Sequence, residues 1–146
     1  MGTDMPPLTR IASLLYEAVH HTRKTVDEAV RGHGVTVSQW AVLERLARRP
    51  GLSGAELARE LLLTPQAAHQ TLTTLVRKGL IERRPDPNHA RIYRAVLTDE
   101  GRRLAELCRA DSRAIHRQVL AAFDEDERAT LIALLQRYVD ALAALE

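Results

Sequence analysis

The stretch LSGAELARELLLTPQAAHQTL, residues 52–72, contains two helix starts that lie 11 residues apart. Ser53 is suited to cap the first helix because Glu56 follows three residues later, which is the spacing of a capping box. Thr64 is suited to cap the second, and Pro65 fits the first helical position because the N–H that proline lacks is not needed there. A short helix, a three-residue turn and a second helix make a helix-turn-helix. We therefore predict that the second helix can enter a major groove of DNA.

The composition of the chain is that of an ordinary globular protein. Its 146 residues suit a single domain, residues 1–146, and 45% are hydrophobic and 27% charged. There is no apolar run near twenty residues, so we expect no membrane span. Residues 1–10 lack the apolar core of a signal peptide, which predicts a cytoplasmic protein. One cysteine, Cys108, excludes an internal disulfide.

The charge is unevenly distributed along the chain, although the net charge is only +2. Residues 51–97 contain seven basic and four acidic side chains, a net charge of +3. Residues 98–146 contain seven basic and ten acidic side chains, a net charge of −3. The basic excess thus falls on the helix-turn-helix and the segment after it, as expected of a face that binds phosphates. The alternative is a solvated surface whose charge happens to be uneven.

Two further helices are predicted before the helix-turn-helix. Residues 8–31 carry apolar side chains at steps of three and four, the pattern of a helix with one apolar face. Gly32 and Gly34 end that helix. Thr36 and Gln39 form a second capping box and begin the next helix.

The segment after the helix-turn-helix is predicted to be a β-hairpin. Residues 80–84 and 92–97 have the composition of strands, and the Pro-Asp-Pro-Asn sequence between them is typical of a turn. A hairpin with a long basic tip at this position is a wing. The predicted fold class is therefore mainly α with a small β-hairpin wing (α+β), and the winged helix-turn-helix unit covers about residues 36–98.

Long helices are predicted at both ends of the chain. Thr98 caps one, with acidic residues in its first turn, and Asp124 caps the last. The first and last helices carry long apolar stripes but have little to pack on within one protomer. We predict that residues of about 8–34 and 99–146 form dimerisation helices across a two-fold axis, because helix-turn-helix proteins read half-sites as symmetric pairs. The alternative is that they close back on their own chain.

Several short motifs accompany this order of elements: LTP at residues 63–65, LVRKGLIER at 75–83, DP at 86–87 and LTDEG at 97–101. With Arg91 in the wing, they resemble the MarR family of bacterial winged-helix transcription factors over almost the whole chain. The resemblance implies a triangular homodimer that binds palindromic double-stranded DNA. It also implies that a small ligand, or in some members thiol oxidation or a metal, changes the spacing of the two reading heads.

The wing departs from the family pattern at one position. The family usually has an aspartate, one residue and then an arginine that enters the minor groove, the acid helping to hold the basic side chain. Here His89 stands in the place of the aspartate, followed by Ala90 and Arg91. The resemblance implies that Arg91 is the minor-groove arginine, and Asp86 is the candidate to replace the missing acid.

The second helix of the helix-turn-helix has a predicted apolar arc and a polar surface. Ala68, Leu72, Leu75 and Val76 form the arc and are expected to face the core. On the other faces, glutamine can pair with adenine, and threonine offers a hydroxyl and a methyl group to thymine. Backbone N–H groups at helix N-termini can bind phosphate, and the strand arginines can neutralise phosphates. The predicted DNA contacts are Ser53, Thr64, Pro65, Gln66, His69, Gln70, Thr73, Thr74, Arg83, Arg84, Arg91 and Arg94.

Other chemistries find little support in the sequence. The six histidines show no metal-ligand spacing with a nearby acid or cysteine, so no metal site is predicted. There is no G-x-S-x-G, phosphate loop or paired-carboxylate arrangement, so neither an enzyme nor a cofactor is expected. Cys108 lies in a helix stripe, where a buried structural thiol is the ordinary outcome. Peroxide-sensing members of the family keep their reactive cysteine near the first helix, and this chain has none there.

The function predicted from the sequence is a homodimeric repressor that a small amphipathic or aromatic ligand releases from DNA. The resemblance places a ligand pocket where the first, second and fifth helices meet the reading domain. Tyr16, His20 and Trp40 are the polar-tipped residues expected near it, with ordinary packing as the alternative. Two other functions remain open: a winged-helix module that binds proteins without DNA, and a redox sensor that uses Cys108.

Overall fold

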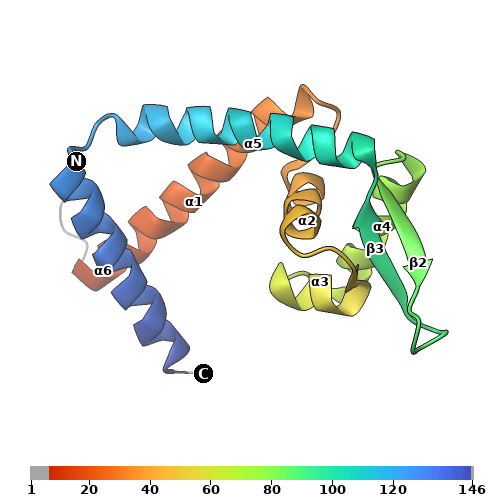
Figure 1. The fold of residues 1–146 in the computed structure, drawn as a ribbon. Coiled ribbons are helices and arrows are strands. Elements are labelled where there is room, and N and C mark those ends of the chain that lie inside the picture. The colour runs from red at the N-terminus through yellow and green to blue at the C-terminus, as the bar shows by residue number, and fades with distance from the viewer. Residues whose placement is uncertain (1–6, 146) are drawn as a thin grey trace. The chain divides into compact units, whose positions relative to one another are not determined.

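The computed structural model describes residues 7–145. Residues 1–6 and 146, which the expected domain also includes, lie outside the described part. The elements are, in order, α1 (Pro7–Arg31), α2 (Val37–Arg48), β1 (Leu52–Ser53), α3 (Gly54–Glu60), α4 (Pro65–Arg77), β2 (Ile81–Pro85), β3 (Tyr93–Leu97), α5 (Asp99–Leu120) and α6 (Glu125–Ala143) (Figure 1). The predicted fold class, mainly helical with a small β-hairpin wing, is confirmed.

The predicted helix starts are formed by the expected caps. The Thr36 hydroxyl accepts a hydrogen bond from the backbone N–H of Gln39 at 3.2 Å, and Ser53 accepts one from Glu56 at 3.3 Å. Thr64 accepts one from Ala67 at 3.1 Å. Each satisfies a backbone donor that the first turn of a helix leaves unpaired. α3 and α4 are therefore joined by the short turn that a helix-turn-helix requires.

The sheet has one more strand than the sequence predicted. Its three antiparallel strands lie in the order β1-β3-β2. β2 pairs with β3 from Ile81 opposite Leu97 to Pro85 opposite Tyr93, and Leu52 of β1 lies opposite Ala95. β1 has only two residues. A strand this short has no periodicity of its own and is defined by its distant partner, so the sequence pattern could not reveal it.

The described chain divides after Ser112 into two compact units. The first contains a closed core in which Leu43, Leu46, Leu57 and Leu75 are all at most 1% exposed. α1 contributes to that core through residues near its C-terminal end, such as Val30. This unit therefore has an apolar core of its own residues.

The apolar arc of α4 is narrower than predicted. Ala68, Leu72 and Leu75 are buried as expected, but Val76 is 39% exposed, so its assignment to the core was wrong. Each helical residue turns about 100° from the one before it. Val76 directly follows the buried Leu75 and is therefore rotated out of the interior.

A glycine allows α5 to start close to the sheet. A Cβ atom on Gly101 would lie 1.9 Å from the carbonyl oxygen of Leu80, a distance that no side chain can occupy. The Thr98 hydroxyl donates to the carbonyl of Gly79 at 2.7 Å and accepts from the N–H of Gly101 at 3.0 Å. These contacts explain why the LTDEG motif needs a threonine and a glycine three residues apart.

The second unit, from Arg113 to the end of the described chain, has no comparable core. α6 contains no buried residue. Its large apolar side chains, including Leu134 at 54% and Leu142 at 50%, remain exposed. The N-terminal part of α1 is similar, with Val19 at 66%. These apolar surfaces are uncovered in a single protomer.

Candidate nucleic-acid interface

α4 carries a polar surface whose glutamine and histidine side chains make no hydrogen bond within the described chain. Gln66, His69, Gln70 and Thr73 are exposed, and Thr74 is half-buried. The side chains of both glutamines and of the histidine take part in no hydrogen bond among residues 7–145. Glutamine amides can both donate and accept, which is the capacity that a base edge requires. The opposite side of the helix is fixed by its buried apolar residues, so this surface has a defined direction.

The two N-cap hydroxyls are already engaged. Ser53 and Thr64 each accept the backbone hydrogen bond that caps their helix. A hydroxyl that accepts such a bond can still donate its own proton, for example to a phosphate oxygen. Pro65 is exposed at the first turn of α4. Thr64 and Pro65 are thus exposed at the start of α4, and Ser53 is half-buried at the start of α3.

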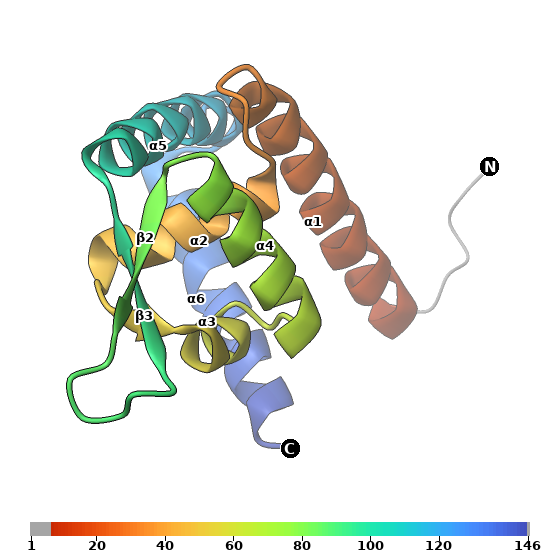
Figure 2. The same cartoon turned by 90° about the vertical axis from the view of Figure 1, so that its right-hand side faces the viewer.

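The wing loop joins β2 to β3 and projects beyond α3, as both views of the fold show (Figures 1 and 2). Two backbone hydrogen bonds close it, from Asp86 N–H to the Ile92 carbonyl and from Ile92 N–H to the His89 carbonyl, each at 2.8 Å. Arg91 is exposed within this loop and forms no ion pair among the described residues. Its charge is therefore available to an external anion.

Asp86 does not take the place of the acid that is missing beside Arg91. Its Oδ2 atom accepts a hydrogen bond from Nε of Arg94 at 2.6 Å. Its Oδ1 atom accepts from the backbone N–H groups of Asn88 and His89 at 2.7 and 3.1 Å. The Arg94 guanidinium, aided by the N–H of Asn88, lowers the pKa of the Asp86 carboxyl. Among the described residues, Asp86 is the only buried polar or charged one.

Arg94 is held by more than one partner. Its Nη1 atom donates to Oε2 of Glu56 at 2.9 Å and to the carbonyl of Gly51 at 3.1 Å. Asp86 above all, with Glu56, raises the pKa of Arg94. The pKa of Glu56 is lowered, mainly by its hydrogen bond from the backbone N–H of Ser53. The charge of Arg94 is thus compensated by two carboxylates, whereas Arg84 pairs with one and Arg91 with none among the described residues.

On β2, Arg84 is exposed and Arg83 is half-buried. Arg83 donates to the Thr73 hydroxyl of α4 at 3.3 Å, which links the strand to the reading helix. Arg84 pairs with Glu82 at 3.0 Å, and both side chains are more than half exposed. An exposed pair of this kind is weak, so Arg84 can exchange its partner for a phosphate at little cost.

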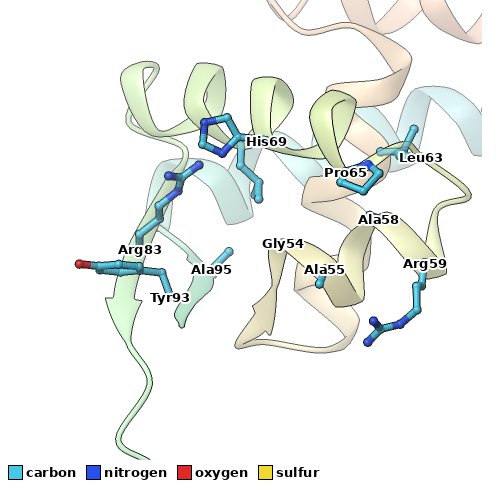
Figure 3. Close-up of a pocket in the computed structure, with 11 residues that line it drawn as sticks. Gly54, Ala55, Ala58, Arg59, Leu63, Pro65, His69, Arg83, Tyr93 and Ala95 are labelled. Carbon is cyan, nitrogen blue, oxygen red and sulfur yellow. The ribbon is translucent and has the colours of Figure 1, made fainter. Parts of the chain in front are cut away.

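A pocket of about 490 Å³ lies between α3, α4 and the sheet. Figure 3 shows Arg83 and His69 on one side of it and Arg59 on the other. The floor is apolar, formed by side chains such as Ala58 and Leu72. No local sequence pattern marks this pocket, because its walls come from four separate elements. The full lining is Gly54, Ala55, Ala58, Arg59, Leu63, Pro65, His69, Leu72, Arg83, Tyr93 and Ala95.

The three residues expected near a ligand are not gathered in one hollow. His20 helps line a second hollow of about 430 Å³ beside the N-terminus of α2, together with basic residues of α1 such as Arg23. Tyr16 and Trp40 are not among its lining residues. Tyr16 is 76% exposed, and Trp40 is half-buried with an indole N–H that has no partner.

The single thiol is poorly suited to redox chemistry. Cys108 is fully buried in α5, and burial raises its pKa to about 11. The thiolate, which is the reactive form, is therefore scarce near neutral pH. No group of three His, Cys, Asp or Glu side chains in residues 7–145 could hold a metal ion. None of the helices in that range is long and apolar enough to cross a membrane.

Comparison with known proteins agrees with this geometry. A sequence profile described as the MarR family matches residues 33–92. The HTH-type transcriptional repressor Rv2887 of Mycobacterium tuberculosis is 34% identical over 124 residues, which cover 85% of this chain and 89% of the repressor. A crystal structure of a MarR family transcription regulator superposes with a TM-score of 0.82 at 30% identity, covering 96% and 97% of the two chains. The crystal structure of the mycobacterial protein in complex with salicylic acid gives a TM-score of 0.72 at 33% identity, covering 92% of this chain and 98% of that one.

Proposed function

This chain belongs to the MarR family of transcription regulators, and we propose that it acts in the cytoplasm as a homodimeric repressor that binds palindromic double-stranded DNA. Gln66, His69 and Gln70 on α4 read base edges in the major groove. Arg91, at the tip of the wing, enters the adjacent minor groove, where the negative potential favours an inserted arginine. Ser53, Thr64 and Arg84 contact phosphates and fix the register.

Two observations carry this proposal: the exposed glutamines of α4 have no side-chain hydrogen bond among the described residues, and the exposed wing arginine Arg91 has no ion pair there. The apolar side of α4 is buried, so its glutamines point outward from a rigid body. A protein-binding module without DNA would leave that arrangement of glutamines and the exposed Arg91 unexplained. A redox sensor would require a reactive thiol, and Cys108 is buried with a raised pKa.

The exposed apolar helices support dimerisation. An uncovered apolar stripe as long as that of α6 is an aggregation hazard in a monomer. Pairing of the terminal helices with those of a second copy would cover it. The two α4 helices of such a pair would then read two half-sites related by a two-fold axis, which is why the DNA is expected to be palindromic.

A small aromatic carboxylate is the class of ligand that we propose releases the DNA. The mycobacterial relative has been crystallised with salicylic acid. In this chain, the pocket between α3, α4 and the sheet combines an apolar floor with the guanidinium groups of Arg59 and Arg83 at its edges. Since Arg83 also contacts Thr73 of the reading helix, a carboxylate bound to Arg83 would compete with that contact. Tyr16, His20 and Trp40 remain the predicted residues of an alternative site.

Selection of duplexes from a randomised pool tests the DNA-binding function. The wild-type chain is expected to enrich an inverted repeat, and its affinity for that duplex should fall steeply with salt because bound cations are released from the phosphates. An absence of enrichment, or an affinity that does not depend on salt, would favour the protein-binding module. Addition of salicylate tests the ligand: it should weaken binding of wild type more than of an Arg83→Ala variant.

A further inference from the structure

One arginine connects the wing loop to the start of α3. Arg94 stands on β3, and its guanidinium reaches Asp86 at the beginning of the wing loop at 2.6 Å. The same group reaches Glu56, which belongs to the capping box of α3, at 2.9 Å. A third bond, to the Gly51 carbonyl, ties it to the residue before β1. Arg94 therefore joins two parts of the DNA-binding unit that approach DNA separately.

Asp86, the partner of Arg94 in the wing loop, also determines the backbone path of that loop. The side chain of Asp86 is 5% exposed and accepts hydrogen bonds from the N–H groups of Asn88 and His89. A carboxylate this deeply buried is costly unless it is paired. Arg94 supplies that pairing, so the path of the loop backbone from Asp86 onward depends on the arginine.

Arg91 is the residue whose position depends on this loop. It lies in the loop that Asp86 organises, and the residue two positions before it is His89 and not an acid. Its position is thus set by the loop backbone. We infer that Arg94 is a positioning residue, which through Asp86 and Glu56 fixes the wing loop relative to α3 so that Arg91 reaches DNA while α4 is in its groove. This inference rests on the proposed DNA-binding function.

The same contacts argue against a direct phosphate contact by Arg94. Its side chain is 34% exposed and pairs with two carboxylates, whereas Arg84 is 67% exposed with one exposed partner. Moving Arg94 to a phosphate would leave the buried Asp86 unpaired. The phosphate contact that the sequence suggested for Arg94 is therefore replaced by an indirect role.

A double-mutant cycle on the selected duplex distinguishes the two roles. Wild type, Arg91→Ala, Arg94→Gln and the double variant are compared over a series of salt concentrations. If Arg94 acts through Arg91, each single variant lowers the salt slope by about one. The double variant should then lose no more than Arg91→Ala, with affinities that agree within about twofold.

Other outcomes of the cycle overturn the inference. A double variant whose slope falls by about two shows that Arg94 contacts a phosphate on its own. An Arg94→Gln variant that binds like wild type shows that the wing does not depend on it. If wild type itself shows no salt-dependent binding, the proposed function fails and this inference fails with it. In the first two cases the function stands and only the inference is lost.

A measurement without DNA tests the positioning directly. Amide hydrogen exchange of Asn88 and His89 should be faster by about tenfold in Arg94→Gln, because their acceptor is no longer fixed. Arg103→Ala is the matched control, since Arg103 is also ion-paired but lies on α5 and pairs with Glu100. Should Arg94→Gln fail to fold, Asp86→Asn replaces it in both experiments, because its amide oxygen can still accept the two loop N–H groups while the ion pair with Arg94 is lost. Unchanged exchange in the variant that folds contradicts the inference.

Discussion

The winged helix-turn-helix unit (residues 36–98), which is the reading unit, and the last helix, α6, differ in how far their apolar residues are buried. In the unit, the central leucines, such as Leu43 and Leu57, are fully buried among elements of the same chain. In α6 no residue is buried, and Leu134 and Leu142 are half exposed. The difference indicates that the reading unit is stabilised by one chain, whereas α6 needs an apolar partner. We expect that partner to be a second copy.

The largest effect should come from removing the exposed stripe. Deletion of residues 130–146 is expected to give a monomer or an insoluble chain, because the apolar surface of the remaining terminal helices would lose its counterpart. Light scattering measures the mass of the product. A soluble dimer of unchanged affinity between chains would mean that α6 plays no part in assembly.

A pair of leucine substitutions sharpens the comparison. Leu57→Ala should lower the free energy of unfolding by about 2–5 kcal/mol, because it leaves a cavity in a closed core. For Leu134→Ala the decrease in the free energy of unfolding should instead depend on protein concentration, as expected of a residue at an interface between chains. Urea unfolding at several concentrations separates the two cases. If both losses were equally independent of concentration, the contrast between the two regions would be wrong.

The reading surface predicts a smaller and more selective effect. Gln70→Ala should reduce discrimination at one base position per half-site by about 1–3 kcal/mol if the glutamine pairs bidentately. Affinities for a set of duplexes with single base changes provide the measurement. Gln118→Ala on α5 is the matched control and should leave the discrimination among these duplexes unchanged. Equal weakening on every duplex would make Gln70 a phosphate contact.

The smallest effect concerns the one large apolar side chain that the reading unit leaves almost fully exposed. Leu62, in the turn between α3 and α4, is 93% exposed and has a φ of 53°. That backbone conformation is unfavourable for leucine and free for glycine. Leu62→Gly should therefore raise the free energy of unfolding by up to about 1 kcal/mol. A substantial loss in thermal unfolding experiments would show that this leucine has a partner.

The features that could be predicted from the sequence depend on residues that are close together in the chain. The caps at Thr36, Ser53 and Thr64 depend on residues within three positions, and the wing follows from its turn residues and strand composition. The outward direction of Gln66 and Gln70 follows from helix periodicity. Each of these features involves neighbours whose spacing is fixed by the element itself.

What escaped prediction depends on residues far apart in the chain. The bonds of Arg94 to Glu56 and Gly51 join positions 38 and 43 residues apart, and no local pattern marks them. β1 and the pocket between α3, α4 and the sheet are of the same kind. Asp86 carried a local signal, since aspartate followed by proline often starts a turn, but its partner Arg94 carried none.

The stoichiometry of the complex is the property to measure, since two identical chains are expected to bind one palindromic duplex. Light scattering of wild type mixed with the selected duplex, at about 50 mM salt where phosphate contacts are strong, measures this. We predict a complex of two chains and one duplex, and a duplex reduced to one half-site should bind much more weakly. A stable complex of one chain with one duplex, or equal affinity for the half-site, would contradict the account.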